Sequence, residues 1–212
     1  MAVKAFLSDF DGTIVYKDML DVLCGIVGKE EESKKLNEEF IADKKNGLVL
    51  LAKRINLLKG VSLLDIEYKL KENDYLIEGA EELFNYLHQN GVVTILHSGN
   101  ILPVLNYYKN KLHIDFVVGI QPRMIGNVVD GISLDDFPSN NFKADGCSAI
   151  LSQLNIPKDK VIALGDSPSD ISVFNISSIS IAINPKGDID SIVDFIIKSN
   201  LKEVISILNT LL

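Results

Sequence analysis

Cysteine is scarce in this 212-residue chain, and its scarcity excludes two kinds of site. Only Cys24 and Cys147 occur, and they form no Cys-x-x-Cys pair. A disulfide framework or a zinc site therefore has no support, and two isolated cysteines fit a reducing cytoplasm. No apolar run approaches the ~20 residues that cross a bilayer, and the first residues show no signal-peptide pattern. We therefore expect a cytoplasmic protein without a membrane partner.

Positive charge is also in short supply. Lys and Arg number 21 against 29 Asp and Glu, which gives a formal net charge of −8. A surface of this charge repels the phosphate backbones of DNA and RNA, so no nucleic acid partner is expected. An anionic substrate would need local positive charge, from a metal ion or from a few basic side chains.

Short apolar runs alternate with segments of helical periodicity over most of the chain. This order predicts an α/β fold, a doubly wound parallel sheet with a Rossmann-like core. The expected strands are 3–9, 92–97, 115–118, 161–164 and 179–183. The expected helices of this part are 78–89, 102–112, 145–154, 168–175 and 201–211, and residues 124–132 predict a small hairpin on the rim.

The first two expected strands are separated by far more than the roughly 30 residues of a strand–helix–strand unit. The surplus has helical periodicity at 20–27, 31–44, 48–58 and 63–71. We therefore predict an inserted helical cap over residues 15–76, with a core formed by residues 1–14 and 77–212. Ligands of α/β folds bind at the carboxyl edge of the sheet, so a cap rooted there would act as a lid.

Two acidic motifs directly follow predicted strands. Asp9 and Asp11 lie in the sequence D-F-D-G-T after the first strand, and Asp166 and Asp170 lie in G-D-S-P-S-D after the strand at 161–164. Clustered carboxylates suit a hard cation such as Mg²⁺. Either motif alone could also be an ordinary acidic turn or a helix cap.

Two further polar segments are expected at the same edge. Ser98 and Gly99 follow the strand at 92–97, and we expect them to open a helix whose free N–H groups bind phosphate. Ser98 alone could be an ordinary N-cap residue. Lys143 precedes the helix expected at 145–154, and taken alone it could be an ordinary lysine without a functional role. The fold brings all four clusters to one rim, and together they indicate a site.

In this order the clusters resemble the motifs of the haloacid dehalogenase superfamily of phosphatases, and of its phosphoserine phosphatase-like branch in particular. That family has a D-x-D-G-T motif, a Ser or Thr after the second strand, a Lys, and a G-D-x-x-x-D motif. The resemblance covers essentially the whole chain. It implies Mg²⁺ as cofactor and a small phosphorylated metabolite as partner, and we expect a monomer or a homodimer.

The resemblance implies a role for each acidic residue. Asp9 attacks phosphorus and forms an aspartyl-phosphate, which divides one difficult displacement into two easier steps. Asp11 protonates the leaving alcohol and then activates water. Mg²⁺ is held by the Asp9 carboxylate, the Asp11 carbonyl and Asp166, and Asp170 supports this metal shell.

The resemblance also implies which residues hold the substrate. Ser98, the Gly99 amide and Lys143 bind the oxygens of the transferred phosphoryl group. In the cap, Arg54 matches the position whose guanidinium binds the phosphoserine carboxylate. Asp18 falls where the family has a Glu that contacts the substrate amino group. Arg54 and Asp18 could instead be solvated helix residues.

Departures from the family pattern leave the substrate open. Gly47 or Leu48 stands where a cap Phe is expected, Ser169 replaces an Asn, and Asn100 replaces a second Gly. One alternative is a phosphatase of a sugar phosphate, a nucleotide or a methionine-salvage ester. Another is a phospho-accepting signalling domain, which the length and the cap disfavour. We interpret His97 as a structural residue at a strand end.

Overall fold

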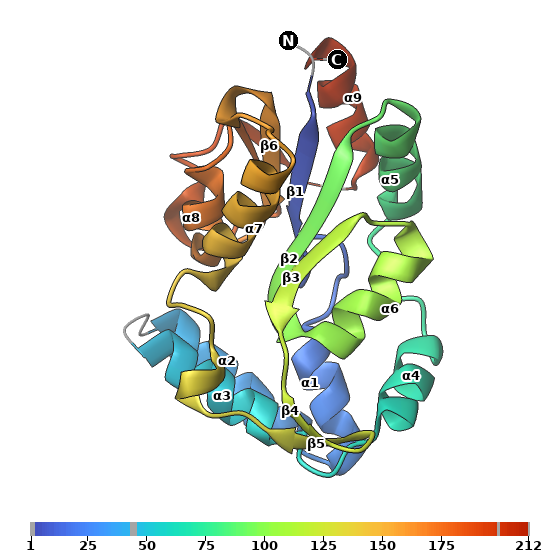
Figure 1. The fold of residues 1–212 in the computed structure, drawn as a ribbon, viewed down its shortest axis with the longest axis vertical. Coiled ribbons are helices and arrows are strands. Elements are labelled where there is room, and N and C mark those ends of the chain that lie inside the picture. The colour runs from blue at the N-terminus through green and yellow to red at the C-terminus, as the bar shows by residue number, and fades with distance from the viewer. Residues whose placement is uncertain (1–2, 43–45, 199, 212) are drawn as a thin grey trace.

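The computed structural model describes residues 3–42, 46–198 and 200–211, and its centre is a six-stranded parallel sheet (Figure 1). The strand order is β3-β2-β1-β6-β7-β8. The chain therefore winds outward from β1 in one direction and from β6 in the other, so the predicted doubly wound fold is confirmed. The strands are β1 (Ala5–Asp9), β2 (Val93–Ile101), β3 (Phe116–Ile120), β6 (Val161–Gly165), β7 (Ile179–Ile183) and β8 (Phe195–Ile197).

Side-chain alternation along the strands supplies two apolar cores, one on each face of the sheet. On β1, Phe6 faces one core while Ala5 and Leu7 face the other, and all three are fully buried. The first core is covered by α5 (Ala80–Gln89), α6 (Leu102–Leu112) and α9 (Lys202–Leu211). The second is covered by α7 (Phe142–Gln153) and α8 (Ile171–Phe174). Burial on both faces explains the nearly continuous apolar runs of these strands.

Four α-helices lie between β1 and α5 in the described part of the sequence, as the periodicity predicted. They are α1 (Met19–Cys24), α2 (Glu30–Ala42), α3 (Gly47–Asn56) and α4 (Leu63–Lys71). Figure 1 shows them together at one end of the molecule, beyond the carboxyl ends of the central strands. The predicted end of the second of these helices at Lys44 lies outside the described residues. The predicted cap limits, residues 15–76, stay a prediction.

The chain enters and leaves this helical segment at a single place. Val15 forms an antiparallel bridge with Leu76. The Tyr16 N–H donates to the Tyr75 carbonyl at 3.0 Å, and the Ile77 N–H donates to the Ile14 carbonyl at 2.9 Å. The helices are therefore joined to the sheet by two paired segments, which we call the neck (residues 14–16 and 75–77).

The predicted hairpin is present, but it pairs with the helical segment as well as lying on the rim. Its strands are β4 (Arg123–Ile125) and β5 (Val128–Gly131). Val129 exchanges backbone hydrogen bonds of 2.9 Å with Gly60 and Val61, in the connection between α3 and α4. The hairpin thus ties α3 and α4 to the core at a second point in addition to the neck.

The structure differs from the sequence expectation at several places, among them β8, β2 and α7. Strand β8 was not predicted, because its three residues are too few to show a periodicity. Strand β2 continues to Ile101 instead of ending at His97, and α7 begins at Phe142 instead of Asp145. Single 3-10 turns occur at η1 (Gly25–Val27), η3 (Leu134–Asp136), η4 (Lys158–Lys160), η5 (Pro168–Asp170) and η6 (Gly187–Ile189). Within the described ranges, every helix is too short or too polar to cross a bilayer.

Candidate active site

Asp9 and Lys143 form a buried ion pair at the carboxyl end of β1. Asp9 is the last residue of β1, and Lys143 lies in the first turn of α7. Lys143 Nζ is 2.8 Å from Asp9 Oδ1 and 3.0 Å from Asp170 Oδ1. Burial raises the pKa of Asp9 well above its ordinary value, the charge of Asp170 raises it further, and Lys143 opposes this rise. Burial alone would lower the pKa of Lys143, but Asp170 and Asp9 outweigh burial and raise it, so this ammonium stays charged.

Asp170 is fully buried and anchors the turn that carries Asp166. Its Oδ2 accepts the Asp166 N–H and the Ser167 N–H, both at 3.2 Å. Burial tends to raise the pKa of Asp170, but Lys143 and these contacts lower it overall. Asp170 is therefore a fixed anion that holds Lys143 beside Asp9.

Asp166 lies beside the first acidic motif, as the order of strands predicted. Gly12 has a φ of 82°, and a Cβ atom at this position would overlap the Asp166 carboxylate. This turn therefore requires glycine for its backbone conformation and for space. Burial raises the pKa of Asp166, although Lys186 opposes the rise.

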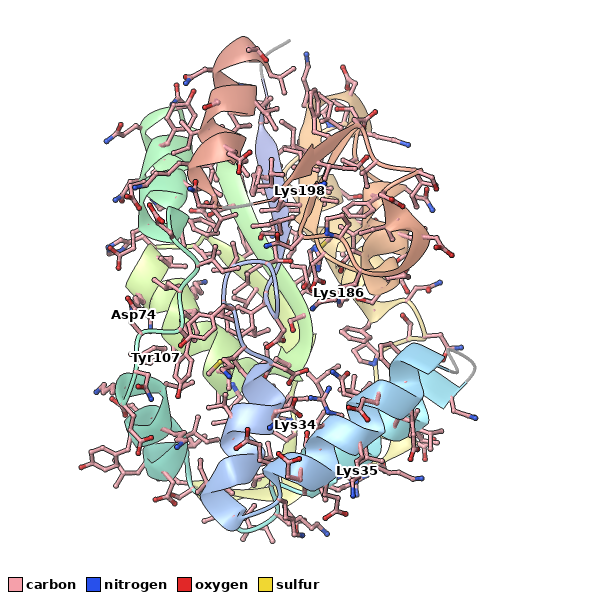
Figure 2. All side chains as sticks on the ribbon, turned by 180° about the vertical axis from the view of Figure 1, so that it is seen from behind. Lys34, Lys35, Asp74, Tyr107, Lys186 and Lys198 are labelled. Atoms are coloured by element: carbon pink, nitrogen blue, oxygen red, sulfur yellow. The ribbon has the colours of Figure 1, made fainter. Side chains whose placement is uncertain are left out.

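Lys186 was not predicted as a site residue. Its Nζ is 2.6 Å from Asp166 Oδ2, and its backbone N–H donates to the backbone carbonyl of Asp166 at 2.7 Å. Figure 2, seen from behind, shows Lys186 at the end of the sheet nearest to α2 and Lys198 farther from it. The sequence offered no spacing signal, because Lys186 follows β7 and reaches Asp166 through the sheet topology alone.

The Asp11 carboxylate is held by donors from three segments. Its Oδ1 accepts the Met19 N–H at 2.8 Å, and its Oδ2 accepts the Ser98 hydroxyl at 2.9 Å. Asn100 Nδ2 lies 3.2 Å from both carboxylate oxygens. Burial and then the charge of Asp18 raise the pKa of Asp11 to about 7, while the three donors oppose this shift. Asp11 is therefore balanced between its two protonation states near neutral pH.

The expectation that Ser98 and Gly99 open a helix is wrong. Strand β2 runs through both residues, and α6 begins only at Leu102. The reason is a bulge, since the four steps from His97 to Ile101 match only two steps on β3. The bulge brings the Ser98 hydroxyl to Asp11. A Cβ atom at Gly99 would lie 3.3 Å from Leu51 of α3, so the helical segment closes directly over the bulge.

Arg54 and Asp18 meet in a polar cluster between α1, α2 and α3, in which Arg54 is buried and Asp18 is partly exposed. Arg54 Nη2 is 2.6 Å from Asp18 Oδ1 and 2.9 Å from Asp21 Oδ1. Its Nε donates to the Ser33 hydroxyl at 3.1 Å, and its Nη1 donates to the side-chain oxygen Oδ1 of Asn37 at 3.2 Å. Asp21 was not predicted, although its position three residues after Asp18 on a helix was an available signal. Two carboxylates face one guanidinium here, so the cluster keeps an excess of negative charge.

A cation has two candidate positions. One oxygen or nitrogen atom from each of Asp9, His97 and Asp170 lies within 4.8 Å of the others. That position already receives the Lys143 ammonium, and burial followed by Lys143 lowers the pKa of His97 to about 3, so His97 is neutral. The predicted set of Asp9, the Asp11 carbonyl and Asp166 offers only oxygen donors. Burial is the main cause of the raised pKa values of Asp9 and Asp166, and a hard cation at these oxygens would offset that cost of ionisation.

Comparison with known proteins decides the family. Residues 3–175 match the family model of haloacid dehalogenase-like hydrolases. The chain belongs to this family. A phosphoserine phosphatase of Methanocaldococcus jannaschii is 31% identical over 95% of this chain and 96% of its own length. A phosphoserine phosphatase of Campylobacter jejuni is 26% identical over 97% of this chain and all of its own length.

Solved structures agree with this family assignment. A phosphoserine phosphatase with an analogue of the phospho-aspartyl intermediate superposes with a TM-score of 0.86 and 29% identity, over 98% of this chain and 99% of that one. A substrate-bound phosphoserine phosphatase gives a TM-score of 0.85 and 28% identity over the same shares. The predicted family, fold and hydrolase class of the chain are therefore confirmed. The roles of the individual site residues stay predictions.

Proposed function

We propose that this chain hydrolyses O-phospho-L-serine, or a similarly small phosphate monoester, with Asp9 as the nucleophile. The observation that carries the proposal is the position of the Asp9 carboxylate at the end of β1. Its Oδ1 is 2.8 Å from Lys143 Nζ, and Asp11 follows two residues later. Similarity to proteins named phosphoserine phosphatases supports this substrate class.

The reaction has two steps. An Asp9 oxygen forms a bond to phosphorus, the ester P–O bond breaks, and the leaving oxygen takes the proton of Asp11. Asp11, now a carboxylate, removes a proton from water, which attacks the aspartyl-phosphate, releases phosphate and restores Asp9. The pKa of Asp11, raised to about 7, suits a group that must act first as acid and then as base.

Positive charge must balance the phosphoryl group as it is transferred. Lys143, the Ser98 hydroxyl and the Gly99 amide are the proposed phosphate ligands, and the buried position of Lys143 strengthens its attraction for an anion. The Ser98 hydroxyl donates a hydrogen bond to Asp11, so Ser98 as proposed phosphate ligand and Asp11 as proposed proton donor are adjacent.

Asp9, the Asp11 carbonyl and Asp166 would hold Mg²⁺, with Asp170 fixing the turn behind them. When bound, this ion would neutralise charge on the phosphate oxygens. The proposal is supported by the all-oxygen donor set and by the raised pKa values of the two buried carboxylates, Asp9 and Asp166.

The helical cap, residues 15–76, is proposed to select the substrate. The Met19 N–H, one residue after Asp18, donates to Asp11 at 2.8 Å, so the Arg54–Asp18 cluster lies close to the proposed proton donor. A guanidinium beside an excess carboxylate is complementary to a group that carries both a carboxylate and an ammonium, as phosphoserine does. We keep the cytoplasmic location and a monomer or homodimer as predictions.

One observation favours a second substrate class. Four side chains of the chain itself already accept hydrogen bonds from Arg54: Asp18, Asp21, Ser33 and Asn37. A phosphate ester without a carboxylate would leave this network intact. A phosphatase of another small phosphate ester, such as a sugar phosphate, is therefore the alternative.

Phosphate release from O-phospho-L-serine with Mg²⁺ tests the proposed function. Wild-type turnover should disappear in Asp9→Asn and with EDTA, while the same substitution at the exposed Asp159 should leave it intact. Turnover of a generic aryl phosphate alone, still dependent on Asp9, would retain the phosphatase and reject the substrate. Inactivity on both, or activity that survives in Asp9→Asn, would contradict the mechanism.

Arg54→Ala tests the proposal that Arg54 binds the carboxylate of the substrate. We expect kcat/KM for phosphoserine to fall roughly 10- to 100-fold, the value of a hydrogen bond between charged groups, while an aryl phosphate without a carboxylate is hydrolysed as before. Lys53→Ala, an exposed neighbour on α3, is the matched control. An equal loss on both substrates in a folded variant would assign Arg54 to cap structure and favour the alternative substrate class.

A further inference from the structure

Asn100 lies in the β2 bulge and is almost fully buried. Two extra residues in β2 relative to β3 put Ser98 and Asn100, two positions apart, on the same side of the bulged strand. Both side chains reach the same carboxylate, that of Asp11. Re-aiming side chains toward a site is a recurrent use of β-bulges.

The hydrogen bonds of Asn100 fix which end of its amide faces Asp11. The Ile101 N–H donates to Asn100 Oδ1 at 2.9 Å. The carbonyl oxygen of the side chain is thereby directed at the backbone, and the NH₂ group is directed at Asp11. The Asn100 N–H donates to Ser98 Oγ at 2.9 Å, so the two residues that contact Asp11 also hold each other in place.

We propose that Asn100 is a positioning residue that orients the Asp11 carboxyl group for proton transfer to the leaving oxygen. This inference rests on the proposed function. The amide nitrogen is 3.2 Å from both carboxylate oxygens, so it restrains both oxygens and not only one of them. The family pattern has a glycine at this position, so the contact belongs to this chain's own sequence.

The contact acts when the ester bond breaks. The P–O bond electrons stay on the leaving oxygen, the Asp11 proton moves to that oxygen, and Asp11 becomes a carboxylate. Donors already aimed at Asp11 stabilise the negative charge that develops there. Asn100 therefore matters most for a leaving group that must be protonated, such as an alcohol. It matters least for an acidic phenol, which leaves as its anion.

The test compares leaving groups in Asn100→Ala and Asn100→Gly. The measured quantity is kcat/KM, which reports only the steps up to departure of the leaving group. The substrates are O-phospho-L-serine, or another alkyl phosphate that the wild type hydrolyses, and p-nitrophenyl phosphate. We expect a roughly 10- to 100-fold loss on the alkyl phosphate and less than a threefold change on the aryl phosphate. Asn106→Ala, on the exposed side of α6, is the matched control.

Circular dichroism reports whether each variant folds, and Asn100→Gly supplies the residue of the family pattern if Asn100→Ala misfolds. Equal losses on both substrates in a folded variant, or no loss on either, would overturn the inference. Such results leave the proposed function standing as long as wild-type turnover depends on Asp9. Wild-type turnover that does not depend on Asp9 would overturn the proposed function itself, and the role of Asn100 with it.

Discussion

Replacing Asp11 by Asn should change how the stability of the metal-free protein depends on pH. The folded state raises the pKa of Asp11 from 3.8 to about 7, mainly through burial and secondly through the charge of Asp18. A carboxyl group with a raised folded pKa binds its proton more tightly in the folded than in the unfolded chain. Its contribution to stability is therefore fully present below pH 4 and is lost as pH rises toward 7.

The size of the effect follows from the two pKa values. One pKa unit corresponds to 1.36 kcal/mol, so a rise of about three units makes ionised Asp11 destabilising by about 4 kcal/mol above pH 7. Asparagine has no proton to lose. The Asn side chain also disturbs the donors Met19, Ser98 and Asn100, but this cost does not vary with pH and acts as a constant offset.

Urea unfolding followed by circular dichroism, in EDTA between pH 4 and pH 8.5, measures the effect. The free energy of unfolding of Asp11→Asn minus that of the wild type should rise in favour of the variant by about 3.5 kcal/mol between pH 4 and pH 8 and then level off. The same substitution at the exposed Asp159 controls for the loss of one negative charge. A difference that stays constant within about 1 kcal/mol over this range would refute the assignment of a raised pKa to Asp11.

Two further predictions concern the lysines of the site. Lys143→Met should lower the free energy of unfolding at pH 8 by about 3–5 kcal/mol, because it leaves Asp9 and Asp170 buried without their cation. The loss should shrink near pH 5, where one of these carboxylates takes up a proton. A small loss in thermal unfolding that does not depend on pH would contradict this prediction. Lys186→Met should strengthen Mg²⁺ binding about two- to fivefold by calorimetry, since it removes a partly exposed ion pair from Asp166, and an equal gain in Lys198→Met would reduce the effect to net charge.

The local pattern of apolar and polar residues was sufficient to predict most strands and helices of the α/β core. The β1 segment alternates between two apolar cores and is buried on both faces, so it appears in the sequence as a continuous apolar run ending at Asp9. The four α-helices between β1 and α5 were predictable because the segment between β1 and β2 is too long for a single crossover. Strand β8 was missed because it consists of three residues and depends on pairing with β7.

Several contacts of the site were not predictable because they depend on geometry that sequence spacing does not encode. The bulge in β2 exists through its register with β3, and without it neither Ser98 nor Asn100 would reach Asp11. Lys186 reaches Asp166 only because β6 and β7 are neighbours in the sheet. For Ser98 a helix start was expected, and the helix begins four residues later because the strand continues through the bulge.

The charges of the described site residues also support the proposed cation. Four carboxylates, those of Asp9, Asp11, Asp166 and Asp170, face the ammonium groups of Lys143 and Lys186. With a proton on Asp11 the balance is three negative charges against two positive, and a phosphate ester would add up to two more negative charges in a buried environment. These charges hold Asp9, the proposed nucleophile, in place but would repel the proposed substrate. A divalent ion at Asp9 and Asp166 would remove that repulsion.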